Sequence, residues 1–199
     1  MRGGCNLSYV DEKILDFINQ AQKELIEQNI CEGPVKVGKK GYEFKESLFY
    51  DGKLSVYIPN EFIDMPENMK NIKYPSNQRP EIIKMDETGT TNIMLSRIDN
   101  QLDEDQVEDL KDAMKALLKK MNPSNVFFTD GVESIDGKNI AYFEFKSPAI
   151  DVAIYNLMFF LEFKGKTVMG TFCCIYDEYK NWRDIAFQVM KTIRVSKEA

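Results

Sequence analysis

Residues 152–163 carry apolar side chains at both odd and even positions, and they constrain the fold more than any other segment. A strand with one face in water alternates apolar and polar residues, so a strand that is apolar on both faces must be covered on both. Asn156 and Glu162 interrupt the stretch, which is far shorter than the ~20 residues of a membrane-spanning helix. The segment therefore predicts a strand inside a sheet, between two layers, and no membrane insertion.

Three segments have helical periodicity. Residues 8–30 place an apolar stripe on one face and end before Gly33 and Pro34, because proline lacks an amide donor and restricts the preceding residue. The second predicted helix starts at a cap formed by Asp103 and Gln106 and ends near residue 122, and the third starts near Asp177.

The stretches between these helices have strand periodicity. The predicted strands are residues 42–44, 48–50, 54–58, 82–85, 93–98, 126–129, 139–147, 152–163 and 167–176. Turns such as Asp51-Gly52 and Asp136-Gly137 join neighbouring strands, so we expect antiparallel pairing. The prediction is an α+β fold: a three-layer α/β/α sandwich around a mostly antiparallel sheet. We expect one domain over residues 1–199, with an N-terminal amphipathic helix in residues 1–33 and the sheet with two further helices in residues 34–199.

Charge and composition exclude several functions. The net charge of −6 repels phosphate backbones, so we expect no nucleic-acid partner. The chain has no histidine, which excludes Cys-His and Ser-His nucleophilic sites. Four scattered cysteines do not form a disulfide framework, and they favour a reducing compartment and a cytoplasmic location. We expect no catalytic residue, no metal site and no cofactor.

Three motifs have weaker functional interpretations. The match to G-x-x-x-x-G-K between Gly33 and Lys39 follows a helix and enters strand-like sequence, which is the wrong context for a phosphate-binding loop. The acidic residues between 99 and 112 complement the start of a helix better than they form a calcium loop. Cys173 and Cys174 are adjacent in a strand and should point to opposite faces. They are either two buried small residues or a redox-active pair.

Two groups of residues are candidates for binding. Lys73, Tyr74 and Arg79 lie on a proline-stiffened loop over residues 73–80, which could present them to a carboxylate, a phosphate or a peptide. Trp182 begins the apolar stripe of the last helix, so it is either a core residue or an interface anchor. A pocket between sheet and helix could use four aromatic residues, namely Tyr142, Phe143, Tyr155 and Phe160.

The order of elements resembles the α/β/α sandwich of the PsbP photosystem proteins, the Mog-type Ran-binding factor and bacterial relatives of unknown function. The resemblance is carried by residues 54–62, by the closing hairpin of residues 164–174 with Gly170, and by residues 182–193 as the terminal helix. It implies a non-enzymatic binding protein, such as a scaffold, an assembly factor or a chaperone-like adaptor for a secreted protein. Metal binding of the PsbP type uses histidine, which this chain lacks, so no site residue is carried over.

The sequence thus leaves two functions open. The first is an intracellular binding or adaptor protein that presents a sheet face or the loop of residues 73–80 to another protein. The second is a binding protein for a small apolar ligand, held in a pocket between sheet and helix. We expect no enzymatic activity in either case.

Overall fold

The centre of the molecule is a seven-stranded antiparallel sheet, in a computed structural model that describes residues 28–76 and 79–196. Its strand order is β5-β6-β7-β11-β10-β9-β8. The strands are β5 (Ile63–Asp64), β6 (Ile82–Met85), β7 (Asn92–Gln101), β8 (Val126–Ile135), β9 (Lys138–Ser147), β10 (Ile154–Phe163) and β11 (Lys166–Ile175). β10 lies between β9 and β11, which confirms its predicted place inside the sheet.

Two smaller sheets accompany the large one. One has the strand order β12-β4-β3, and the other pairs β1 with β2. Their strands are β1 (Val35–Val37), β2 (Lys40–Tyr42), β3 (Phe44–Phe49), β4 (Leu54–Pro59) and β12 (Arg194–Val195). Asp51 and Gly52 have φ values of 58° and 77° in the turn between β3 and β4, which is the left-handed conformation that such a hairpin requires. The predicted hairpin is confirmed.

The described residues contain three α-helices, α2 (Glu67–Lys73), α3 (Val107–Met121) and α4 (Tyr179–Lys191). Short 3₁₀ turns, η1 (Glu104–Gln106) and η2 (Tyr176–Glu178), precede α3 and α4. Asp103 and Gln106 form the predicted capping box at the start of η1. The helix predicted over residues 8–30 lies outside the described residues, apart from residues 28–30.

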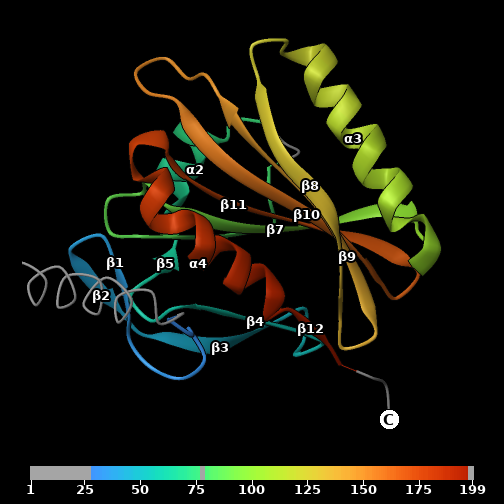
Figure 1. The fold of residues 1–199 in the computed structure, drawn as a ribbon, viewed down its shortest axis with the longest axis horizontal. Coiled ribbons are helices and arrows are strands. Elements are labelled where there is room, and N and C mark those ends of the chain that lie inside the picture. The colour runs from blue at the N-terminus through green and yellow to red at the C-terminus, as the bar shows by residue number, and fades with distance from the viewer. Residues whose placement is uncertain (1–27, 77–78, 197–199) are drawn as a thin grey trace, which may run out of the picture.

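The helices cover opposite faces of the large sheet (Figure 1). α3 packs on β9 and β10 from one side, and α4 packs on β10 and β11 from the other, where it also contacts β4. We call these faces the α3 side and the α4 side. The predicted three-layer fold around an antiparallel sheet is confirmed.

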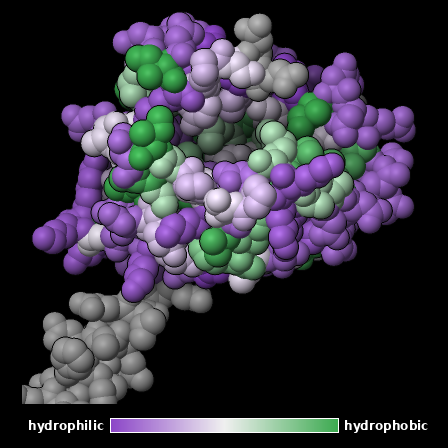
Figure 2. Space-filling view, turned by 90° about the horizontal axis from the view of Figure 1, so that it is seen from above, coloured by the Kyte–Doolittle hydropathy of each residue, from purple (hydrophilic) through white to green (hydrophobic). Residues whose placement is uncertain are grey.

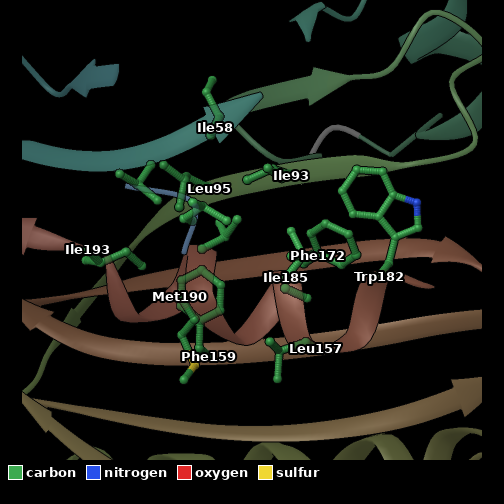
Figure 3. Packing of buried hydrophobic residues seen from close by; sticks show 14 of the residues in the cluster. Ile58, Ile93, Leu95, Leu157, Phe159, Phe172, Trp182, Ile185, Met190 and Ile193 are labelled. Atoms are coloured by element: carbon green, nitrogen blue, oxygen red, sulfur yellow. The ribbon is translucent and has the colours of Figure 1, made fainter. Parts of the chain in front are cut away.

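The largest core lies on the α4 side (Figure 3). Leu157 and Phe159 of β10 meet α4 there, and the Trp182 ring lies 5.5 Å from that of Phe172. Phe159 stands opposite Gly170 on β11. A Cβ atom at Gly170 would lie 1.9 Å from the Phe159 ring, so the packing of Phe159 requires glycine at this position.

Candidate functional site

The two faces of the large sheet are covered to different extents. Along β10, Leu157 and Phe159 point to the α4 side and are buried, whereas Asn156 and Met158 point to the α3 side and are half-buried. β11 repeats this alternation, with half-buried Thr171 on the α3 side. The centre of the α3 side is therefore partly open.

This open strip lies between two buried clusters. The cluster beneath α3 contains Ala141, Phe143, Phe145 and Phe160. The cluster beneath α2 contains Met65, Ile83, Met85, Met94 and Cys173. We call the strip between the clusters the groove, and its half-buried floor consists of Ser96, Asn156, Met158, Met169 and Thr171. Figure 2 shows a hollow in the molecule viewed from above, with hydrophobic side chains at several places on its rim.

An ion-pair cluster fixes the rotation of α3 beside the groove. Lys111 Nζ lies 3.0 Å from Asp130 Oδ2 on β8, and Lys115 Nζ lies 2.5 Å from Asp130 Oδ1. The Lys111 side chain is 3% exposed. Since these lysines hold one flank of α3 toward β8, the opposite flank, which contains Leu117, faces the groove.

α3 carries more apolar surface than the sheet covers. The stripe Leu110, Met114 and Leu118 packs on the cluster beneath the helix. A second stripe at four-residue spacing, Ala113, Leu117 and Met121, is exposed. Leu117 is 47% exposed and Met121 71%. A surface helix usually has a single apolar stripe, so this second stripe leaves more apolar surface exposed than the packing of α3 on the sheet requires.

Further large apolar side chains are exposed near this end of the sheet. Val126 begins β8, opposite Lys146 near the end of β9, and Ile150 and Val152 lie in the following link to β10. Ile72 is 80% exposed on α2. Single exposed apolar residues are ordinary, and Val126, which stands opposite Lys146, points to the α4 side and not to the groove.

The residues predicted on the 73–80 loop hold α2 and the loop to the rest of the chain. Lys73 Nζ donates to the Gly89 carbonyl, and Arg79 pairs with Glu67 and donates to Asn71 Oδ1 at 2.9 Å. Tyr74 packs into the cluster beneath α2. Each of the three thus has a partner within the chain.

Trp182 lies in the core and not at a surface. It is 3% exposed, and its ring packs against those of Tyr42, Phe62 and Phe172. The interface-anchor interpretation requires an exposed indole, whereas the apolar stripe of α4 turns this side chain toward the sheet.

The four predicted pocket residues do not line one pocket. Tyr142 and Tyr155 lie on the α4 side, where Tyr155 is buried and Tyr142 packs against Phe187. Phe143 and Phe160 are buried on the α3 side beneath α3. Neighbouring residues on a strand point to opposite faces, so the adjacent pair of residues 142 and 143 could not share a cavity.

Glu144 is fully buried and held by hydrogen bonds from three side chains. Arg183 Nη2 donates to Oε1 at 2.7 Å, Thr129 Oγ1 donates to Oε1 at 2.7 Å, and Tyr155 Oη donates to Oε2 at 2.9 Å. Burial by itself would raise the pKa of Glu144, but these hydrogen bonds outweigh it and lower the pKa. An ionised, fully engaged carboxylate ties β9 to α4 and is poorly suited to general acid–base catalysis.

The described residues contain neither a group of the usual metal ligands nor a membrane-spanning helix. No three or more His, Cys, Asp or Glu side chains gather there as metal ligands. No helix in the described ranges is long and apolar enough to span a membrane.

Sequence reasoning missed the groove floor. The available signal was the contrast along β10, where odd positions are all large and apolar while Asn156 and Glu162 occupy even ones. That contrast marks one side of the strand as less buried. It does not reveal that α2 and α3 stand apart.

Comparison with known proteins shows similarity of fold. No family model and no curated protein matches the sequence. The cyanobacterial PsbP protein CyanoP from Synechocystis sp. PCC 6803 is similar in structure, with a TM-score of 0.57 and 11% identity over 81% of this chain and 98% of that chain. LpqN of Mycobacterium tuberculosis, described as involved in cell envelope biogenesis, has a TM-score of 0.52 and 11% identity over 81% of this chain and 95% of that chain. The PsbP-like part of the resemblance is confirmed for the fold.

Proposed function

We propose that this protein with a PsbP-like fold is a non-enzymatic adaptor, which holds an apolar helical segment of another protein in the groove between α2 and α3. The observation that carries the proposal is the exposed stripe of Ala113, Leu117 and Met121, beside a half-buried sheet floor. The stripe offers a partner helix the same four-residue spacing with which helices pack against one another.

Charge and side-chain chemistry favour a polypeptide as the occupant. The net charge of −6 opposes nucleic acid and anionic lipid headgroups. Met121, Met158 and Met169 lie on the rim and floor of the groove. Flexible thioether side chains adapt to apolar helices of different sequence, which suits an adaptor or a chaperone-like protein.

A non-enzymatic role is part of the proposal. Without histidine, acid–base chemistry near neutral pH would need a carboxylate or thiol with a suitably shifted pKa. Glu144, the fully buried carboxylate, has a lowered pKa, and burial raises the pKa of the Cys173 thiol to about 11. Both pKa shifts move the group away from titrating near neutral pH, where a general acid or base would have to work.

A display selection tests the proposal. We would select segments of about 20 residues that bind the full chain and measure their affinity by fluorescence anisotropy. Selected segments should have helical apolar periodicity, and Leu117→Glu should weaken their binding at least about tenfold. The matched control Val132→Glu changes an apolar residue on β8 that is 39% exposed, and it should leave binding unchanged. Equal binding by both variants, or selection of segments without apolar periodicity, would overturn the proposal.

A further inference from the structure

A cavity lies on the outer face of the sheet formed by β3, β4 and β12 (Figure 1), and it shares no residue with the groove. Its volume is about 440 Å³, which is in the range of small-molecule sites. The turn between β8 and β9 closes one side of it. The lining includes Glu46, Leu48, Ser55, Asp136, Arg194 and Val195.

The strand register sets the floor of the cavity. Ser55 on β4 stands opposite Leu48 on β3 and opposite Arg194 on β12, with Cβ atoms about 5 Å apart at each step. Glu46 lies two residues from Leu48 and therefore on the same face of β3. The neighbour of Ser55, Leu54, points into the core instead. Side chains from β3 and β12 thus flank Ser55 on both sides.

The Ser55 hydroxyl is a polar group that the described part of the chain leaves without a hydrogen-bond partner. The residue is 7% exposed, and it lines the cavity. A largely buried hydroxyl normally pairs with a protein group, a water molecule or a ligand. This one is therefore available to a molecule that enters the cavity.

The end of α4 holds the Arg194 guanidinium in place. Its Nη1 donates to the Lys191 carbonyl at 2.8 Å and to the Ile193 carbonyl at 2.7 Å. Nε and Nη2 have no partner within residues 28–76 and 79–196. These two nitrogens form one edge of the planar guanidinium, which matches the two oxygens of a carboxylate.

Two carboxylates complete the lining. Glu46 and Asp136 form no ion pair with any described residue. Leu48 adds an apolar surface that is 65% exposed. The cavity thus presents two negative charges, one positive charge and an apolar surface. A matching ligand has two positive charges, one negative charge and an apolar stem.

We propose that this cavity binds a free basic amino acid, arginine or lysine. The ligand's carboxylate pairs with Nε and Nη2 of Arg194 and accepts a hydrogen bond from the Ser55 hydroxyl. Its two cationic groups pair with Glu46 and Asp136, and its methylene stem covers Leu48. An amino acid with an apolar side chain would leave one carboxylate of the cavity unpaired, and an inorganic anion would be repelled by both carboxylates.

Isothermal titration calorimetry of the full chain with L-arginine and with L-lysine tests the proposal. We expect one molecule of either amino acid to bind per chain, with a Kd below about 1 mM. Arg194→Ala should weaken the binding of L-arginine at least about tenfold. The same variant should bind agmatine, which is arginine without its carboxylate, at least as tightly as the original chain does. A general loss of structure would weaken both ligands.

The carboxylates are tested by the double variant Glu46→Gln/Asp136→Asn. It should weaken the binding of L-arginine and of agmatine at least about tenfold, because both ligands keep their two cationic groups. Asp136 has a φ of 52°, and asparagine tolerates this left-handed conformation. The substitution therefore preserves the turn between β8 and β9.

Two control variants lie outside the cavity. Glu87→Gln removes an exposed carboxylate in the turn between β6 and β7, and Leu117→Glu changes the groove. Both should bind L-arginine as the original chain does, so the two proposals fail separately. Thermal unfolding checks that every variant is folded. Failure of both amino acids to bind, or unchanged affinity for L-arginine in folded Arg194→Ala, would overturn the proposal.

Discussion

The Lys111 ammonium on α3 lies 3.0 Å from the Asp130 carboxylate on β8, although the Lys111 side chain is 3% exposed. Asp112 and Glu108 also lie within 4 Å of this ammonium. A buried lysine needs such partners, because an unpaired charge would be costly to desolvate. The pair sets the rotation of α3, and so places Leu117 on the flank that faces the groove.

We expect Asp130→Asn to lower the free energy of unfolding by about 1–3 kcal/mol, because it removes the strand-side partner of a buried ammonium. Urea unfolding measures the loss. The control is Asp99→Asn, whose pair with Lys166 is exposed on both sides and should contribute little to stability. An equal loss in the two variants would show that the burial of Lys111 has no energetic consequence.

Gly170→Ala should be strongly destabilising. Its Cβ would lie 1.9 Å from the ring of Phe159, which is 1% exposed and cannot move without disturbing the core. Overpacking of this kind costs about 1–3 kcal/mol or more. Gly41→Ala is the control, because no atom lies within 4 Å of its added methyl group. Similar midpoints of thermal unfolding for the two variants would contradict this packing.

The Glu144–Arg183 network should make stability depend on acid pH. The pKa of Glu144 is lowered from its ordinary value of 4.5, so the unfolded chain binds the proton more readily than the folded one. The stability from this carboxylate is therefore full above about pH 4.5 and is lost as the pH falls below it. We expect Glu144→Gln to cost about 1–3 kcal/mol at pH 7. Urea unfolding at a series of pH values measures the difference in free energy of unfolding between Glu144→Gln and the original chain, and this difference should shrink below pH 4.5. A difference that stays constant down to pH 3 would contradict the ionised state assigned to Glu144.

The adjacent thiols Cys173 and Cys174 should stay reduced under mild oxidant. Their side chains lie in different clusters on opposite sides of the sheet, and burial raises the pKa of both. In a C5S background, iodoacetamide should label exposed Cys31 in the folded chain, and it should label Cys173 and Cys174 only in guanidinium. A mass loss of two hydrogens between them in the folded chain would instead support the redox-pair hypothesis.

Local signals predicted the hairpins and caps of the fold. Asp51-Gly52 has the turn conformation its sequence indicates, and Asp103 with Gln106 caps the second predicted helix. β8 extends to residue 135, beyond the predicted end at Thr129, because an edge strand tolerates polar residues and a register shift. The sequence did not predict β12, because its two residues, Arg194 and Val195, adopt a strand only by pairing with the distant strand β4.

The site was less predictable, because it depends on how far apart α2 and α3 stand on the sheet. A sheet face was among the predicted binding surfaces, but no local pattern shows that Met158 is only half-buried while Phe160, on the same face, is fully buried. The cluster around Cys173 gathers residues from three strands and α2. Such convergence is set by register and cannot be obtained from spacing within one segment.

Methionine methyl NMR tests the groove most directly. The full chain, labelled with ¹³C at methionine methyl groups, is titrated with a helical peptide from the display selection. We expect the signals of Met121, Met158 and Met169 to shift on binding, and those of Met65 beneath α2 and Met190 in the α4 core to stay in place. Saturable binding that leaves Met121, Met158 and Met169 unchanged would contradict the assignment of the groove as the binding site.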